Sequence, residues 1–105
     1  MRGDIFELRA NPQAKGHEQQ GPRYAVVLQS DTLPLSTVVA APTTTGSWGT
    51  SFHPEIKFSG QSSRVLIEQM ICVDPNHRFG RKVGRISPAE RDEIDRAVKL
   101  VLGLF

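Results

Sequence analysis

The sequence is poor in the residues that cross-link or anchor small proteins. Its 105 residues include one cysteine, Cys72, so the chain can form neither an internal disulfide nor a cysteine-based zinc site. It contains no apolar run long enough for a membrane-spanning helix, and no signal-peptide or lipidation motif. These absences favour a protein of the reducing cytoplasm.

Signatures of metal and cofactor chemistry are also missing. The histidines stand at positions 17, 53 and 77, which is not the spacing of ligands on one helix or hairpin. Neither a nucleophile elbow nor a phosphate-cradling glycine loop is present. We therefore expect no metal and no cofactor. What remains available is general acid–base chemistry assisted by a fixed guanidinium.

Size and charge narrow the possibilities further. A chain of 11.6 kDa with 38% apolar residues can build one core, so we expect a single domain over residues 1–105, which would gain stability by dimerising. The net charge of +2 is unevenly spread, because the segment 75–86 has no acidic residue. Its four basic residues are Arg78, Arg81, Lys82 and Arg85. Such a run fits a solvated face or an anionic partner equally well.

Hydrophobic patterning predicts a mainly β protein. Short strands are expected over residues 3–8, 24–29, 37–41, 52–58, 64–72 and 82–86. Residues 24–29 are nearly all apolar and should be buried on both faces, whereas Pro54 favours an edge position for 52–58. The strand 37–41 should stop at Pro42, followed by an exposed loop over 43–50. A turn is expected at 74–76.

The last element is predicted to be a helix with a well-marked start. Ser87 is a suitable N-cap, Pro88 suits the first helical position, and Glu90 completes a capping box. The predicted apolar face contains Ile94, Ala97, Val98, Val101 and Leu102, and the helix should end near Gly103. On the other face we expect the pairs Asp92–Arg96 and Asp95–Lys99. The fold class is α+β, a small curled sheet or barrel with a C-terminal helix packed on it.

Three polar segments interrupt this pattern and are candidate site regions. They are the loop 16–23, the loop 43–50 and the middle of strand 64–72. If they converge, the site contains His17, Glu18, Arg23, Thr43, Glu68 and Gln69. Such a set suits RNA cleavage, because the 2′-hydroxyl is an internal nucleophile that needs only a base, an acid and a cation.

Each candidate also has an ordinary structural interpretation. Arg23 could pair with Glu18, and His17 could be an exposed loop residue. Trp48 could either fill its loop or stack on a base. Glu68 is different, because an acid in the middle of an apolar strand should face solvent or be specifically bonded.

Six segments, in order, resemble the MazF/PemK/Kid toxin endoribonucleases of type II toxin–antitoxin systems. They are RGDIF at 2–6, GHEQQGPR at 16–23, YAVVLQSD at 24–31, TVVAAPTT at 37–44, LIEQ-x-x-x-VD at 66–74 and GRIS at 84–87. The resemblance covers essentially the whole chain. It implies an antiparallel, SH3-like barrel and a homodimer. It also implies metal-independent cleavage of single-stranded RNA, often mRNA, which leaves 2′,3′-cyclic phosphate and 5′-hydroxyl ends and arrests translation and growth. A cognate antitoxin would cover the RNA site with its extended C-terminal tail.

The resemblance also implies residue roles. Arg23 would stabilise transition-state charge and Thr43 would hydrogen-bond the scissile phosphate, while His17 and Glu68 are candidate proton acceptors. RNA-contacting roles fall on Glu18, Gln19, Trp48, Gln69, Arg78, Arg81, Lys82 and Arg85. Leu66 and Met70 depart from family arginine positions, and Tyr24 stands where proline is common.

Two other functions fit the same predicted fold. One is a gyrase-poisoning toxin, whose inhibitory contacts would lie in the C-terminal helix, because Leu104 and Phe105 have no role in the predicted core. The other is a barrel that binds RNA without cleaving it.

Overall fold

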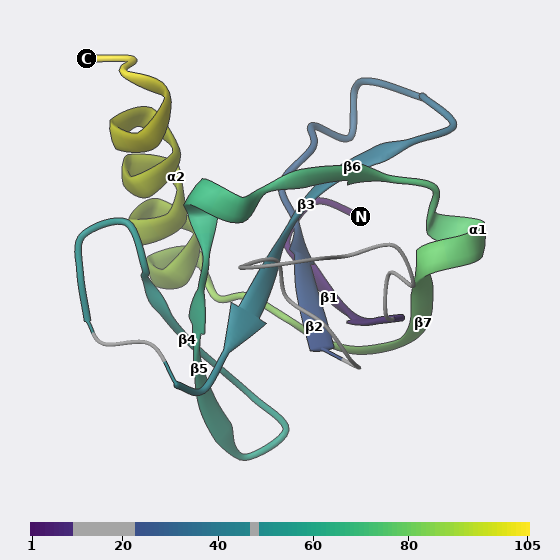
Figure 1. Ribbon diagram of the computed structural model, residues 1–105, viewed down its shortest axis with the longest axis horizontal. Helices are drawn as coiled ribbons and strands as arrows, with labels where there is room; N and C mark the ends of the chain where they lie inside the picture. Colours follow the sequence, from purple (N-terminus) through teal and green to yellow (C-terminus); the bar gives the residue numbers. More distant parts are fainter. Residues whose placement is uncertain (10–22, 47–48) are drawn as a thin grey trace.

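Seven strands form one antiparallel sheet that curls on itself, with a helix along one side (Figure 1). The computed structural model describes residues 1–9, 23–46 and 49–105. The elements are β1 (Asp4–Leu8), β2 (Arg23–Val27), β3 (Val38–Thr44), β4 (Glu55–Phe58), β5 (Gln61–Val65), η1 (Ile67–Gln69), β6 (Ile71–Val73), α1 (Pro75–Arg78), β7 (Phe79–Arg85) and α2 (Pro88–Leu102). The strand order is β4-β5-β3-β2-β1-β7, and β6 also pairs with β3. The predicted fold class is confirmed.

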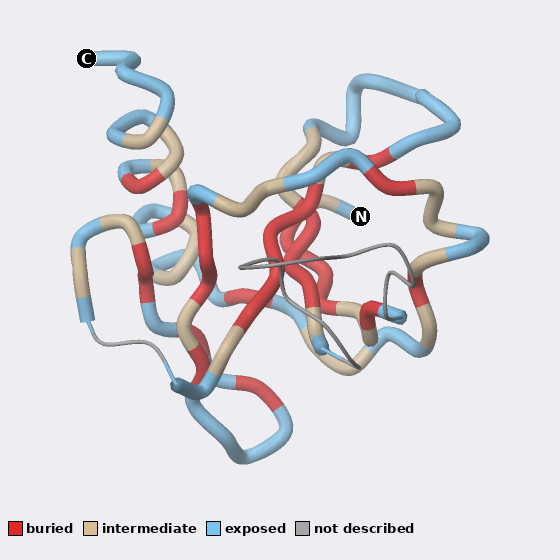
Figure 2. The backbone as a smooth tube through the Cα atoms, viewed as in Figure 1, coloured by how far each residue is buried: buried red, intermediate tan, exposed pale blue. Residues whose placement is uncertain are grey.

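The sheet separates two hydrophobic clusters, and β2 contributes to both. Val26 packs in a cluster with Ile5, Ile56 and Ile94, whereas Ala25 and Val27 pack on the opposite face. Because successive side chains of a strand point to opposite faces, an all-apolar strand fills both clusters. This confirms the prediction of a strand buried on both sides, and Figure 2 shows buried residues along the central strands.

Strand β3 continues past Pro42, so the predicted stop and the exposed position of Thr43 are wrong. The strand pairs with β6 through residues 38–40 and with β5 through Thr43 and Thr44. The Pro42 carbonyl accepts a hydrogen bond from the Leu66 amide at 2.8 Å. The missing Pro42 N–H therefore faces the gap between β5 and β6, where the ladder is interrupted.

The predicted strand 64–72 is three elements, namely the end of β5, the short helix η1 and β6. Leu66 and Ile67 are buried, and the chain turns there so that Glu68 is exposed. The turn thus removes the need to bury a carboxylate in a strand. Two neighbouring predictions also change. The predicted turn at 74–76 belongs to α1, and β7 begins earlier than predicted, at Phe79.

Helix α2 begins and ends as predicted. Both hydrogen bonds of the Ser87–Glu90 capping box are present, and Gly103 adopts the left-handed conformation at φ 71°. Ile94 and Ala97 are buried, whereas Leu102 is 54% exposed and does not belong to the core face.

The predicted pairs along α2 are replaced by others. Arg96 pairs with Glu93, and Asp95 accepts a 2.6 Å bond from Arg2 because the N-terminal segment lies beside the helix. The edge position of β4, which starts after Pro54, is confirmed. In the described part of the chain, no helix has both the length and the apolarity needed to cross a membrane.

Candidate active site

Arg23 and Thr43 lie at the same end of neighbouring strands. The register Ala25 to Pro42 places the start of β2 beside the end of β3. The two residues line a small cavity of about 180 Å³, which we call the threonine pocket. Its lining residues are Arg23, Tyr24, Thr43, Thr44, Thr45, Gln61 and Ser63. Two of the predicted site residues are therefore brought together.

The walls of the threonine pocket are firmly packed. Thr43 is 2% exposed, so its hydroxyl sits at a fixed depth. Tyr24 packs edge-on against Phe58, with ring centroids 5.0 Å apart. Tyr24, which stands where proline is common in the family, therefore forms part of the pocket wall, and Phe58 supports it from behind.

Arg23 also borders a second and larger cavity of about 530 Å³, which we call the arginine pocket. Its lining residues are Glu7, Leu8, Arg9, Arg23, Tyr24, Gly80 and Arg81. Arg23 and Tyr24 line both pockets, so the two cavities meet at these residues. Sequence reasoning missed Glu7, Arg9, Gln61 and Ser63. Arg9 had one signal in the sequence that could have revealed it. It stands at the end of the first strand, and the next strand along the chain begins with Arg23.

Glu68 and Gln69 do not line either pocket. The Glu68 carboxylate contacts His53 Nε2 at 2.9 and 3.0 Å, and the His53 carbonyl accepts from Arg64 at 3.1 Å. His53 is 9% exposed. These contacts tie the segment before β4 to β5 and η1.

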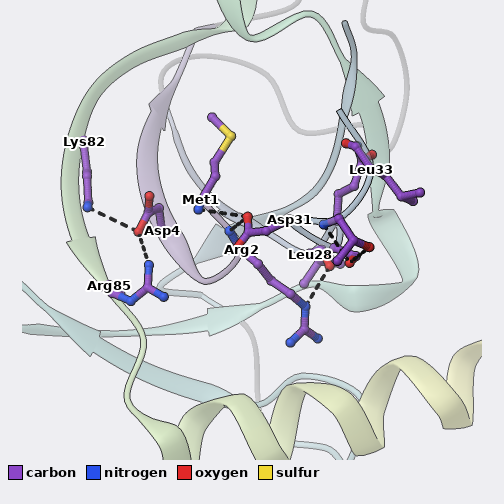
Figure 3. Close-up of polar contacts among 11 residues, drawn as sticks. Met1, Arg2, Asp4, Leu28, Asp31, Leu33, Lys82 and Arg85 are labelled. Carbon is purple, nitrogen blue, oxygen red and sulfur yellow. Dashed lines mark hydrogen bonds and ion pairs between the residues drawn. The ribbon is translucent and has the colours of Figure 1, made fainter. Parts of the chain in front are cut away.

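The basic run 78–85 divides between different environments. Arg78 Nε donates to the Arg9 carbonyl at 3.1 Å, and Arg81 lines the arginine pocket. Lys82 and Arg85 both reach Asp4, at 3.2 and 2.6 Å, and Figure 3 shows the two side chains directed at its carboxylate. The other predicted site residues, His17, Glu18, Gln19 and Trp48, lie outside the described residues.

The described residues suit anion binding better than proton transfer. A guanidinium beside a buried hydroxyl can hold and polarise a phosphoryl group. Among the described lining residues of both pockets, Glu7 is the one carboxylate, and histidine and cysteine are absent. No group of three or more potential metal ligands occurs among the residues that the structure describes.

The fold is that of a known class of toxins. A crystal structure of a MazE–MazF complex from Deinococcus radiodurans superposes with a TM-score of 0.80 and 26% sequence identity. The match covers 99% of this chain and 96% of that one. The curled sheet with its terminal helix is therefore a MazF fold.

Sequence comparison defines the family. Residues 1–102 match the family described as PemK-like, MazF-like toxin of type II toxin–antitoxin system, and the chain belongs to this family. It is 31% identical over 104 residues to the Mycobacterium tuberculosis protein Rv3098A, covering 99% of this chain and 98% of that protein. It is also 31% identical over 111 residues to Endoribonuclease MazF of Staphylococcus saprophyticus, covering 98% of this chain and 91% of the relative. The predicted family resemblance is confirmed.

Proposed function

We propose that this toxin is an endoribonuclease that cleaves single-stranded RNA, including mRNA, at short recognition sequences without a metal ion. The observation that carries the proposal is the shared pocket of Arg23 and Thr43, the two residues to which the family resemblance assigns the scissile phosphate. The name of the staphylococcal relative, Endoribonuclease MazF, supports the same activity.

In this mechanism the 2′-hydroxyl attacks the adjacent phosphorus and the bond from phosphorus to the 5′-oxygen breaks. The products are a 2′,3′-cyclic phosphate and a 5′-hydroxyl, so the proton lost by the 2′-hydroxyl is balanced by one gained at the leaving oxygen. Arg23 neutralises the charge that develops on the phosphoryl oxygens, and the Thr43 hydroxyl donates to one of them.

The resemblance leaves two candidate acceptors for the proton of the 2′-hydroxyl, His17 and Glu68. The Glu68 carboxylate is bonded to His53 and lies outside both pockets. We therefore assign proton abstraction to His17 and give Glu68 a role in fixing the segment before β4.

Replacement of Arg23 by alanine tests the activity. With purified protein, a fluorogenic RNA and EDTA present, the rate should fall by about 10²- to 10³-fold, because one charge-stabilising group is lost. The melting temperature should stay near that of the parent protein, since Arg23 is exposed at a strand end. Arg96→Ala, on the exposed face of α2, is the control and should keep full activity. Full activity of Arg23→Ala would contradict the assignment.

We also propose that the active form is a homodimer free of antitoxin, and that a cognate antitoxin blocks its RNA site when bound. The D. radiodurans structure has MazE bound to MazF, and an acidic peptide tail would suit a groove bordered by arginines. An apolar groove of about 480 Å³ between α2 and the loop after β2 offers the dimer face, since Leu33, Leu102 and Leu104 are exposed there. Light scattering should show that Leu102→Asp lowers the oligomeric mass.

Exposure of the last two residues supports a second candidate, a gyrase-poisoning toxin. Leu104 is 61% exposed and Phe105 is 97% exposed, so neither contributes to the core. Removing Phe105, which does not line the proposed dimer groove, should leave RNA cleavage intact if the toxin is a nuclease. Loss of growth arrest without loss of cleavage would favour the gyrase mechanism. If the parent protein binds RNA but never cuts it, the chain is a non-catalytic RNA-binding barrel.

A further inference from the structure

The arginine pocket contains more positive charge than the proposed cleavage step uses. Three adjacent strands bring Arg9, Arg23 and Arg81 to it, because Leu8 at the end of β1 lies opposite both Arg23 of β2 and Phe79 of β7. Against these three guanidiniums stands one carboxylate, that of Glu7. The described lining residues therefore carry a net positive charge next to the position proposed for the scissile phosphate.

The positive charge of two of these guanidiniums is scarcely neutralised by the residues that the structure describes. Arg81 is exposed, and its side chain makes no hydrogen bond or ion pair with the described residues. The Arg9 guanidinium makes one long bond, 3.4 Å, to the His77 carbonyl. Its backbone, by contrast, is tightly held, since the Arg9 amide donates to the Arg78 carbonyl at 2.7 Å. Both cations are thus positioned by the sheet while their donors remain available to an anion.

Glu7 is fixed in the same cavity by the backbone of β7. Its Oε1 accepts from the Arg81 amide at 3.0 Å. The neighbouring Gly80 permits this approach, because a Cβ there would lie 3.1 Å from both Cβ and Oε1 of Glu7. One carboxylate oxygen is therefore occupied, while Oε2 can accept a hydrogen bond from a ligand.

A ligand that suits this cavity carries both a negative group and a hydrogen-bond donor. A bare phosphate would contact the guanidiniums but leave Glu7 Oε2 without a donor, whereas a nucleotide has a phosphate for the guanidiniums and can offer a base amino group to the carboxylate. The volume of about 530 Å³ lies in the range of small-molecule sites.

We propose that the arginine pocket binds the nucleotide next to the scissile phosphate. Its phosphate lies on Arg9 and Arg81, and its base donates an amino hydrogen to Glu7 Oε2. Uracil has no exocyclic amino group and can offer only its ring N3–H, so we expect it to bind less tightly at that position than the amino-bearing bases. This subsite rests on the proposed nuclease function, because Arg23 joins the two pockets.

The phosphate contacts can be tested by RNA binding. The probe is a short RNA with a mapped cleavage site and a 2′-deoxy sugar there, which removes the nucleophile and permits equilibrium anisotropy. Because both arginines lie on the same phosphate, the double variant Arg9→Ala/Arg81→Ala should reduce the slope of log affinity against log salt by about 0.7, as expected for one lost single-strand phosphate contact, and Arg9→Ala and Arg81→Ala should each reduce it by less. Arg96→Ala should keep the parent slope. An unchanged slope in the double variant would overturn the proposal.

The base contact has a separate readout. The parent protein should bind amino-bearing bases about 2- to 10-fold more tightly than uracil at one of the two positions flanking the scissile bond, as expected for one hydrogen bond. Glu7→Gln keeps an oxygen for the Arg81 amide, so the fold and the salt slope should be retained while the base preference changes. An unchanged preference at both positions would remove Glu7 from the subsite.

These results are distinguishable from failure of the nuclease proposal. If the parent protein cleaves RNA and Arg23→Ala does not, while the double variant Arg9→Ala/Arg81→Ala keeps the parent slope, the subsite alone is wrong. If the parent protein never cleaves RNA, the nuclease proposal is wrong.

Discussion

Strand β7 supplies cations to two clusters that differ in how their charge is balanced. In the arginine pocket, Arg81 lies near Arg9 and Arg23 and its guanidinium has no carboxylate partner among the described residues. In what we call the Asp4 cluster, Lys82 and Arg85 converge on Asp4, whose side chain is 10% exposed. Lys82 and Arg85 therefore stabilise the fold, whereas Arg81 is available to a ligand.

The two clusters differ in charge balance because different residues of β1 lie opposite the cations of β7. Arg85 lies opposite Asp4 in the register of β1 and β7, and Lys82 also reaches that carboxylate. Near the other end of the same strands, Glu7 uses one oxygen for the Arg81 backbone amide. A run of basic residues therefore has no single role. Each cation depends on the group across the sheet from it.

After Arg23→Ala, the largest expected effect is on the pocket side, at Thr43. Thr43→Val preserves the shape of a side chain that is 2% exposed but removes its hydroxyl. If the hydroxyl binds the scissile phosphate, cleavage should fall by about 10²-fold with little change in melting temperature. Thr32→Val, in the exposed loop after β2, is the control and should cleave at the parent rate. Parent-level activity of Thr43→Val would limit Thr43 to packing.

The next effect should appear at Asp4, and in stability. Asp4→Asn weakens two charge-assisted contacts, at 2.6 and 3.2 Å, so the free energy of unfolding should fall by about 1–3 kcal/mol. Urea titration measures the loss, and kcat/KM per folded molecule should be unchanged. A fall in kcat/KM without destabilisation would show that the Asp4 cluster belongs to the RNA site, which would break the contrast with the arginine pocket.

Arg85→Ala should have a smaller effect, because its side chain is 49% exposed and solvent screens its pair with Asp4. We expect a loss of up to about 1 kcal/mol in unfolding free energy. The salt dependence of RNA binding should match that of the parent protein, in contrast to Arg81→Ala. A reduced salt slope for Arg85→Ala would instead support the RNA-binding role that the sequence suggested for the whole basic run.

The capping signals of α2 were read correctly from the sequence, whereas the ion pairs along that helix and the features that depend on distant residues were not. The start of α2 was predictable because Ser87, Pro88 and Glu90 act on each other within one turn. The stop at Pro42 was wrong, since the gap between β5 and β6 that accommodates proline depends on residues more than twenty positions away.

In the candidate site, too, some residues could be predicted from the sequence and others could not. Family resemblance selected Arg23 and Thr43, which do share a pocket. The arginine pocket was missed because it depends on the register of β2, β1 and β7, and the exposed turn of Glu68 depends on the buried Leu66 and Ile67. The pairing of Lys82 and Arg85 with Asp4 spans most of the chain and has no local signature.

The smallest expected effect is on the stability of α1, the short helix whose last residue contacts Arg9 of the arginine pocket. Asp74 caps α1, and α1 ends at Arg78, which contacts the backbone of Arg9. The His77 side chain and then the Asn76 amide, both bonded to the Asp74 carboxylate, lower its pKa from the usual value of 3.8.

A pKa that is lower in the folded state determines the direction in which stability changes with pH. The contribution of Asp74 to stability is fully present above pH 3.8 and is lost as the pH falls through the lower folded-state pKa. Asp74→Asn can still cap α1 but cannot ionise. Urea titrations between pH 7 and pH 2.5 should therefore show a small destabilisation relative to the parent protein at neutral pH that disappears in acid. A difference that stays constant across this range would mean that the carboxylate charge does not support α1, leaving the position of Arg9 to its backbone bonds with Arg78.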